Sequence, residues 1–399
     1  MRILAVADSD SYLKWASCLL DDLPGDWERE LAVVRTPIVP SPQQIAAAVG
    51  ERPLPPVLSA RSLRRTAQRT MPDAIVVACT GPVVDVLVAE VLDELRPRPV
   101  FVTGLPGISV PATDKAWLFR SGCDLFVVHS EREAAEFGEV AGRLGGGGRV
   151  GLARLPFLRT PEELRGPEGI ARFEPDGRER DRVVFATQAK VPRGREEREQ
   201  VLMALAKLAE RRPDLDVVVK LRALDGERQT HNERHPYQRL WQDLGEPGRL
   251  RFAAGSMDEH LAVAAGFVTV SSTAALEAIA RDVPSLVLED FGVSAEMINL
   301  VFEGSGLLGT LDDLADGAFR EAQGAWRSAN YFHPAEVGTW VRLLDELLAG
   351  PREPARSLLD GAEHLAARRR ARLRVEVPPE VLRIGYRTKR RLSRALRTG

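Results

Sequence analysis

Short, continuous apolar runs recur along this chain and are separated by longer segments whose apolar residues have helical spacing. The first run covers residues 3–7, and helical spacing follows over residues 12–23. Continuous apolar runs of this length are typical of parallel strands that are buried on both faces. The same pattern predicts strands at 31–34, 74–78, 100–103, 125–128 and 150–155, and helices at 83–95 and 131–144.

A second series of the same kind begins at residue 183. It predicts strands at 183–187, 217–221, 250–253, 267–270 and 285–288, with helices at 195–211, 237–244, 258–264 and 274–281 between them. Further helices are expected at 312–327 and 334–348. Strands that alternate with helices imply mostly parallel sheets with helices on both faces. The fold class that we expect is therefore α/β, with two tandem Rossmann-like domains.

The length of 399 residues exceeds the usual size of one domain. Residues 159–182 are charged, carry three prolines and lack an apolar stripe, which is typical of a linker. We expect an N-terminal domain over residues 1–165, a linker at 166–182, a C-terminal domain over 183–350 and a basic helical tail at 351–399. Two such domains predict a cleft between the carboxyl ends of their sheets.

Composition narrows the possible partners and compartment. A net charge of -2 argues against a protein dedicated to nucleic acid. The three cysteines are far apart and lie in apolar surroundings, which favours free thiols in a reducing compartment over disulfides or a metal site. No apolar run approaches the roughly 18 residues that span a bilayer. We therefore expect a cytoplasmic protein that is at most peripheral at the inner face of the cell membrane.

The most informative segment is the strand–helix junction at residues 266–280. An apolar, β-branched run ends in Ser271, Ser272 and Thr273, and a helix rich in Ala, Leu and Glu follows at once. Hydroxyl oxygens accept hydrogen bonds from the amides that begin a helix, and those amides together with the helix dipole attract anions. The pattern predicts a contact to a phosphate or diphosphate, although an ordinary helix cap has the same sequence.

Other polar residues follow neighbouring strands of the second series. Gln188 comes after the strand at 183–187, and Lys220 and Arg222 end the strand at 217–221. A pair of cations beside the hydroxyls suits a nucleotide leaving group, because the cations neutralise its negative charge. Glu277, on the following helix, is a candidate to hold a ribose or sugar hydroxyl. Each of these residues could also be an ordinary solvated side chain.

Two histidines lie in the polar stretch after the lysine strand. His231 and His235 have the i, i+4 spacing that can bind zinc on a helix, but Pro236 and the polar residues between them indicate a loop. A contact to phosphate or base is the better functional interpretation, beside that of a solvated loop. We expect no metal site in this chain.

Three segments together resemble glycosyltransferases of the GT-B superfamily. They are Phe185-Ala186-Thr187-Gln188, Val219-Lys220-Leu221-Arg222, and the stretch from Ser271 to Ala278 that is followed by Val283-Pro284. Bacterial capsule-type sialyl- and Kdo-transferases and a group of actinobacterial glycosyltransferases have similar segments. The resemblance implies a nucleotide-sugar donor, as a co-substrate rather than a cofactor, bound by the C-terminal domain. Its contacts would be Ser271, Ser272, Thr273, Lys220 and His235, without a bound catalytic metal.

The resemblance also implies that the N-terminal domain binds the acceptor and supplies the base that deprotonates its hydroxyl. Candidates at strand ends are Asp8 and Asp10, which follow the first strand, and His129, which follows the strand at 125–128. We favour Asp10, although both aspartates could instead cap the helix that begins near Tyr12. Asp114, in the segment after the strand at 100–103, is a candidate for the acceptor pocket.

The C-terminal tail is strongly basic. From Arg368 to Arg397 there are twelve arginines and lysines against two glutamates. A basic amphipathic helix could bind anionic lipid headgroups near a lipid-linked acceptor, or it could brace the N-terminal domain.

The function that we expect is transfer of a sugar from a nucleotide-activated donor to a hydroxyl acceptor, in bacterial cell-surface polysaccharide or glycolipid synthesis. A nucleotide-sugar 2-epimerase or a polyol-phosphate transferase on the same fold is the enzymatic alternative. A catalytically silent nucleotide-binding or scaffolding protein is the alternative from another class.

Overall fold

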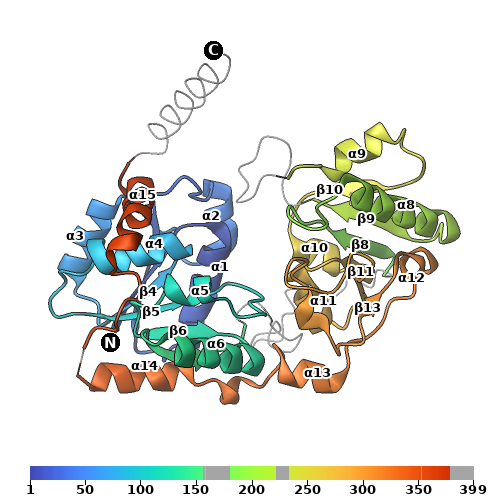
Figure 1. Ribbon diagram of the computed structural model, residues 1–399. Helices are drawn as coiled ribbons and strands as arrows, with labels where there is room; N and C mark the ends of the chain where they lie inside the picture. Colours follow the sequence, from blue (N-terminus) through green and yellow to red (C-terminus); the bar gives the residue numbers. More distant parts are fainter. Residues whose placement is uncertain (156–157, 159–179, 222–232, 352, 378–399) are drawn as a thin grey trace, which may run out of the picture. The chain divides into compact units, whose positions relative to one another are not determined.

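The computed structural model describes residues 1–155, 158, 180–221, 233–351 and 353–377, and Figure 1 shows their helices and strands. The chain forms two compact units. The first combines Met1–Pro106, Ala112–Pro156 and Ala335–Gly399, and the second combines Gly107–Pro111 with Phe157–Pro334. Each unit is built on one parallel sheet, so the predicted α/β fold with two Rossmann-like domains is confirmed.

The first unit contains a seven-stranded sheet with the order β3-β2-β1-β4-β5-β6-β7, and every neighbouring pair is parallel. Its strands are β1 (Arg2–Ala7), β2 (Glu28–Val34), β3 (Val57–Leu58), β4 (Ala74–Ala78), β5 (Val100–Gly104), β6 (Leu125–Val128) and β7 (Arg149–Leu152). The order reverses between β1 and β4. Ligands of open α/β sheets bind at the carboxyl ends of the strands beside such a switch point.

Helices cover both faces of this sheet, which explains why its strands are continuously apolar. In β1, Ile3 and Ala5 belong to one buried cluster and Leu4 and Val6 to another. The first face is covered by α1 (Asp10–Leu19), α2 (Pro42–Val49) and α14 (Trp340–Ala349). The second is covered by α3 (Ala60–Thr70), α4 (Gly81–Val86), the π-helical turn Leu87–Val91, α5 (Asp114–Leu118), α6 (Glu131–Leu144) and α15 (Leu365–Glu376).

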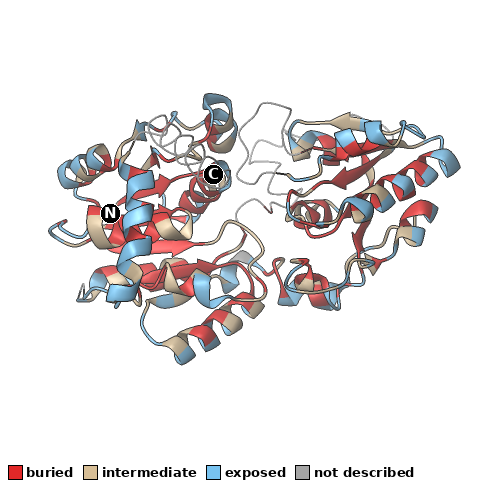
Figure 2. Cartoon of the chain, turned by 45° about the horizontal axis from the view of Figure 1, so that its top comes forward, coloured by how far each residue is buried: buried red, intermediate tan, exposed pale blue. Residues whose placement is uncertain are grey.

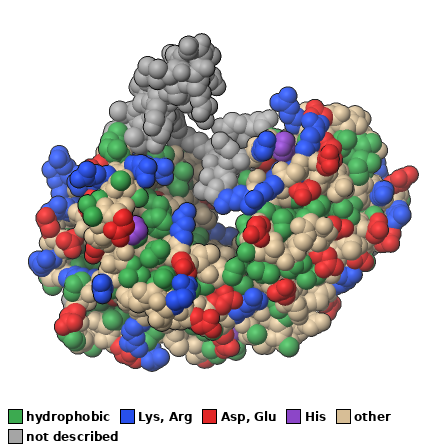
Figure 3. Space-filling view, viewed as in Figure 1, with side chains coloured by type: hydrophobic (Ala, Val, Ile, Leu, Met, Phe, Trp, Pro, Cys, Tyr) green, Lys and Arg blue, Asp and Glu red, His purple; other side chains and the backbone are tan. Residues whose placement is uncertain are grey.

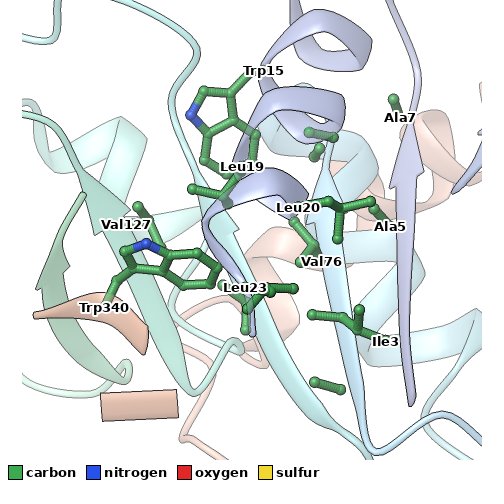
Figure 4. Close-up of a cluster of buried hydrophobic side chains, with 14 of the residues drawn as sticks. Ile3, Ala5, Ala7, Trp15, Leu19, Leu20, Leu23, Val76, Val127 and Trp340 are labelled. Carbon is green, nitrogen blue, oxygen red and sulfur yellow. The ribbon is translucent and has the colours of Figure 1, made fainter. Parts of the chain in front are cut away.

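Figure 4 shows the core of the first face, where helices from both ends of the chain meet the sheet. Trp15 and Leu19 of α1 lie on this face of the sheet, and Trp340 of α14 packs into the same cluster. Full burial of a large apolar side chain contributes about 1.5–3 kcal/mol each. The C-terminal domain expected at 183–350 therefore ends earlier, because residues 335–350 pack on the first sheet.

The second unit contains a six-stranded parallel sheet with the order β10-β9-β8-β11-β12-β13. Its switch point lies between β8 and β11. The strands are β8 (Arg182–Ala186), β9 (Asp216–Lys220), β10 (Arg251–Ala253), β11 (Ala264–Thr269), β12 (Ser285–Leu288) and β13 (Leu308–Gly309). The helices are α8 (Arg195–Arg211), α9 (Tyr237–Asp243), α10 (Met257–Leu261), α11 (Ala274–Ala280), α12 (Leu311–Asp316) and α13 (Gly324–Ala329). Figure 2 shows the strands buried and the outer helix faces exposed.

The single helix predicted at 312–327 is wrong, because the chain forms α12 and α13 there. Gly317 ends α12 in the left-handed conformation, with a φ of 70° that glycine adopts without strain. Arg320 then forms a β-bridge with Ser285 before α13 begins. Helical spacing of apolar residues continues across this turn, so the pattern alone hides the break.

The described part of the basic tail braces the first unit. Arg368 of α15 is buried and donates two hydrogen bonds of 2.8 Å to the carboxylate of Asp85 on α4. Ala371 and Val375 of the same helix belong to the buried cluster on the second face of the seven-stranded sheet. Residues 378–399 lie outside the described residues.

Removing the Asp85 carboxylate is expected to destabilise the first unit. Asp85→Ala leaves the buried Arg368 guanidinium with only the exposed Asp360 carboxylate, at 3.1 Å, as an acidic partner. Breaking a buried pair costs about 3 kcal/mol. Urea unfolding followed by circular dichroism measures the change in the free energy of unfolding. Glu346→Ala is the control, because Glu346 pairs with arginines at the surface and its loss should have a much smaller effect. Equal effects of the two substitutions would contradict the bracing role of α15.

Candidate functional site

The polar residues predicted in the second unit meet at the carboxyl edge of its sheet. Ala186 at the end of β8 pairs with Lys220 at the end of β9, and β8 also pairs with β11. Thr187 and Gln188 therefore follow β8 beside the point where Val270 and Ser271 follow β11. This edge is the switch point of the sheet, where ligands of such folds bind.

Two hydrogen bonds join the segments on either side of this switch point. The amide Nε2 of Gln188 donates to Ser271 Oγ at 2.9 Å, and the Ser271 backbone N–H donates to Gln188 Oε1 at 2.8 Å. Because both ends of its amide are used, Gln188 positions the Ser271 segment. Sequence reasoning placed Gln188 among the donor contacts but did not foresee this partner.

The hydroxyl segment that leads into α11 is folded by its own residues. The Ser272 N–H donates to Thr269 Oγ1 at 3.1 Å, and Ser272 Oγ accepts from the Ala274 N–H at 3.2 Å. Thr273 precedes the helix in helical conformation and makes no capping hydrogen bond through its side chain. Ser272 thus behaves as a local cap, whereas Ser271 is held by Gln188 from the neighbouring strand.

The other donor-side candidates lie around the same edge. The Lys220 carbonyl accepts hydrogen bonds from the Thr187 N–H and hydroxyl at 3.2 and 2.9 Å, and the Lys220 side chain is half-buried. Glu277 is half-buried within the first turn of α11. His235 is half-buried just before Pro236, which precedes α9. Arg222 and His231 lie outside the described residues.

Arg198 organises this edge and was missed by sequence reasoning. Its guanidinium is fully buried and makes five hydrogen bonds, to four backbone carbonyls and one carboxylate. The carbonyls belong to Gln188, Ala189, Pro192 and His235, at 2.8 to 3.1 Å, and the carboxylate to Glu233. The same guanidinium lies 4.8 Å from the centre of the Tyr237 ring. One cation therefore fixes the loop after β8 and the segment that enters α9.

A signal for Arg198 does exist in the sequence. If Arg198 is position i of its helix, Val201, Leu202 and Leu205 are positions i+3, i+4 and i+7. This spacing places Arg198 on the apolar face of the helix. A charged residue on a buried face needs partners, because an unpaired buried charge is very costly.

The switch point of the first unit carries a buried carboxylate. Asp8 follows β1 and is inaccessible to solvent, and its Oδ2 accepts hydrogen bonds from the Thr80 N–H at 2.9 Å and the Thr80 hydroxyl at 2.6 Å. Oδ1 of Asp8 is buried without a hydrogen-bond partner among the described residues. Burial raises the pKa of Asp8, although hydrogen bonds from Thr80 and the charge of Arg120 act in the opposite direction.

A second buried arginine supports this carboxylate. Arg120 donates to the Tyr12 hydroxyl at 2.6 Å, to the Cys79 carbonyl at the end of β4 at 3.2 Å, and to the Gly104 carbonyl at the end of β5 at 3.2 Å. Each unit thus has a buried guanidinium that holds backbone carbonyls at the carboxyl edge of its sheet.

His129, a predicted candidate for the base, lies in the interior of the first unit. It is fully buried, its Nε2 accepts from the Trp15 indole N–H at 2.7 Å, and its Nδ1 lies 3.1 Å from the Ala153 carbonyl. The same Nε2 lies 3.0 Å from the Leu105 carbonyl, so both ring nitrogens contact other groups of the first unit. This side chain links α1 to the chain after β7, and its role as a base stays a prediction.

The two remaining acceptor-side candidates lie on the surface. Asp10 is the first residue of α1 and is exposed. Ser9 is the N-cap residue of that helix, so neither Asp8 nor Asp10 occupies the cap position. Asp114 is the first residue of α5, about half-exposed, and forms an ion pair with Arg143 of α6. This ion pair lowers the pKa of Asp114, and an anchored surface carboxylate of this kind is a poor proton acceptor.

The sequence of the chain matches a known family over most of its length. Residues 3–347 match the model of a family described as "Putative glycosyltransferase (DUF6716)". The chain belongs to this family. No curated protein sequence matches the chain. The match covers most of both units of this family member.

Solved structures of two kinds share the fold of this family member. UDP-GlcNAc 2-epimerase from Methanocaldococcus jannaschii, in complex with UDP-GlcNAc and UDP, is 11% identical, with a TM-score of 0.57 over 88% of this chain and 100% of that chain. The Neisseria meningitidis enzyme bound to UDP-GlcNAc is 12% identical, with a TM-score of 0.54 over 88% and 100%. A UDP-glucosyltransferase from Polygonum tinctorium is 14% identical, with a TM-score of 0.51 over 87% and 98%. These likenesses show a GT-B fold.

Two further findings hold for the described residues. None of the helices in the described ranges combines the length and the apolar character needed to cross a membrane. The same ranges contain no group of three or more His, Cys, Asp or Glu side chains arranged to hold a metal ion.

Proposed function

We propose that this protein transfers a sugar from a nucleotide-activated donor to a hydroxyl acceptor, in bacterial cell-surface polysaccharide or glycolipid synthesis. In this proposal the second unit binds the donor and the first unit supplies the acceptor-side base. The observation that carries the proposal is the pair of hydrogen bonds between Gln188 and Ser271 at the switch point of the second sheet. Membership of a glycosyltransferase family supports the reaction class.

The donor is proposed to bind through its diphosphate at the segment from Ser271 to Thr273. The hydroxyl groups of Ser271, Ser272 and Thr273 donate to phosphate oxygens, and Lys220 at the end of β9 offsets their charge. Uracil is the proposed nucleobase of the donor, because neighbouring GT-B structures contain UDP or UDP-GlcNAc. Hydroxyl groups and a lysine stabilise the leaving group in this scheme, so the proposal is metal-independent and predicts undiminished turnover in EDTA.

The base is proposed to be Asp8, acting through the hydroxyl of Thr80. The acceptor hydroxyl gives its proton to Thr80 Oγ1 while the Thr80 proton passes to Asp8 Oδ2 along the hydrogen bond of 2.6 Å. The acceptor oxygen then forms its bond to the anomeric carbon of the sugar, and the bond from that carbon to the phosphate oxygen breaks. Burial raises the pKa of Asp8 and so makes its carboxylate a better proton acceptor.

Nucleotide binding tests the donor half of the proposal. Thermal shift with CMP, UDP, GDP, TDP and CDP should show the largest stabilisation with UDP, because a ligand of the native state raises stability in proportion to RT ln(1 + [L]/Kd). Gln188→Leu frees the Ser271 segment and should weaken UDP binding by roughly 10-fold or more, as expected for loss of about 1.5–3 kcal/mol from hydrogen bonds to a charged group. Gln238→Leu, at an exposed position of α9, is the matched control. Unchanged UDP affinity in Gln188→Leu would remove the proposed donor site.

A nucleotide-sugar 2-epimerase is the second candidate, because UDP-GlcNAc 2-epimerases are among the structural neighbours. The two reactions differ in their need for an acceptor. A transferase releases UDP at a useful rate only when a hydroxyl acceptor is present, whereas an epimerase interconverts two nucleotide sugars without one. Measurement of free UDP and of the sugar isomers, with and without acceptor extracts, separates them.

A further inference from the structure

The outward faces of α3 and α15 carry arginines in a regular pattern. On α3, Arg61, Arg65 and Arg69 follow one another at i, i+4 and i+8, opposite the buried Leu63 and Ala67. The helix contains four arginines and no acidic residue. The three arginines of this stripe are all exposed.

The last described helix repeats the arrangement. Arg369, Arg370 and Arg374 of α15 are exposed, whereas Arg368, Ala371 and Val375 of the same helix face the protein. Helix α15 contacts both α3 and α4, so two helices that are almost 300 residues apart in sequence present their arginines side by side. Figure 3 shows Lys and Arg side chains gathered over α3 and α15, at the upper left of the view.

Five acidic side chains near these helices are paired with other arginines, and Glu363, just before α15, lies 3.5 Å from His364. Glu94 pairs with Arg64, Glu90 and Glu376 pair with Arg372, and Asp85 and Asp360 pair with Arg368. Within the ranges that the structure describes, the six outward arginines have no acidic partner. We call these six residues the arginine face; they are Arg61, Arg65, Arg69, Arg369, Arg370 and Arg374.

Large apolar side chains lie exposed among these arginines. Leu365 and Leu373 of α15 are 43% and 51% exposed, and Met71, which ends α3, is 61% exposed. Exposed leucines between cations contribute nothing to the solubility of a surface that faces only water. A surface that meets a bilayer uses both, because arginines bind lipid phosphates and apolar side chains enter the headgroup region.

We propose that the arginine face, together with Leu365 and Leu373, docks the first unit on an anionic lipid bilayer. Six cations and two exposed leucines complement phosphate-bearing headgroups in charge and in polarity. This docking is independent of the reaction proposed above. It would hold a glycosyltransferase of this family at the surface where a lipid-linked acceptor resides.

Vesicle co-sedimentation of the full chain tests the proposal. We expect binding to phosphatidylcholine vesicles that contain one third phosphatidylglycerol, no binding to pure phosphatidylcholine, and loss of binding at high salt. R61Q/R65Q/R69Q should lower the partition constant about 100-fold, since each near-surface cation contributes about a factor of five. R369Q/R370Q/R374Q should have a similar effect. The control R211Q/R212Q/R239Q removes three exposed arginines of the second unit and should leave the partition constant unchanged.

The α3 variant is the decisive one, because α3 lies far in sequence from the basic C-terminal segment. Wild-type vesicle binding by R61Q/R65Q/R69Q would overturn the proposal and assign binding to residues outside the arginine face. The proposal would also be overturned if the unaltered chain failed to bind anionic vesicles. If that chain bound a single-stranded RNA probe instead, the arginine face would be a nucleic-acid surface. The thermal unfolding midpoint of each variant is the control for folding. A midpoint equal to that of the wild type shows that a loss of vesicle binding does not result from unfolding.

Discussion

Replacing Arg198 with methionine is expected to destabilise the second unit strongly and to abolish nucleotide binding. The substitution removes five hydrogen bonds at once and leaves four carbonyls and the Glu233 carboxylate without their donor. Removing one partner of a buried ionic network costs about 3–5 kcal/mol. Urea unfolding measures this loss, and isothermal titration with UDP measures the affinity.

A second variant separates positioning from stability. Arg198→Lys keeps a positive charge for Glu233 but cannot reach both loops, because an ammonium lacks the planar fork of the guanidinium. We expect a folded protein whose KM for the donor rises at least 10-fold while kcat changes little. Arg195→Met on the same helix is the control, since Arg195 pairs with Glu199 and Asp243 at the surface. An Arg198→Lys protein with unchanged donor KM would reduce Arg198 to a purely structural residue.

Asp8→Asn is expected to lower turnover by about 100- to 10,000-fold, the usual contribution of a general base, without weakening donor binding. Asparagine keeps the carbonyl oxygen that accepts from Thr80 but cannot take up a proton. Acceptor-dependent UDP release at saturating donor measures turnover. Asp10→Asn is the matched control and should retain wild-type turnover. Thr80→Val, which removes the hydroxyl between Asp8 and the acceptor, should show a loss similar to that of Asp8→Asn.

Asp8→Asn, which should lower turnover, is expected to raise the stability of the protein at neutral pH. Because burial raises the pKa of Asp8, the folded state binds its proton more tightly than the unfolded chain does. Wild-type stability therefore falls as pH rises from the ordinary Asp pKa of about 4 through the raised pKa, and it stays lower above that window. Asp8→Asn should be more stable than the wild type at neutral pH, and the difference should vanish below about pH 4. A variant that loses stability at every pH would indicate that Asp8 serves only to join β1 to β4.

The strands could be predicted well because both sheets are buried on both faces. Every continuous apolar run of the sequence became a strand, and α6 and α8 begin and end where the spacing predicts. Helix α3 was missed because its four arginines obscure a narrow stripe of Ala60, Leu63 and Ala67. The edge strands β3 and β13 have two residues each, too few for any periodicity.

The candidate site could be predicted only where its signal is local. Ser271, Ser272 and Thr273 stand together in the sequence, so their strand–helix junction identified them. The partners of these residues are distant: Gln188 and Ser271 are 83 residues apart, and Asp8 and Thr80 are 72 apart. Such pairs depend on strand order, which one sequence does not reveal. Arg198 was hidden for the same reason, because its carbonyl partners come from two separate loops.

The return of α14 and α15 to the first sheet has a consequence for how the protein folds during synthesis. The second unit, apart from the short segment Gly107–Pro111, is one continuous stretch of chain that can fold as soon as it leaves the ribosome. The first unit must wait, because Trp340 and Arg368 emerge only near the end of translation. Until then the apolar face that α14 covers is exposed. A circular permutant that begins at residue 335 and joins the old termini would supply α14 and α15 first, and it should aggregate less during synthesis than the natural chain.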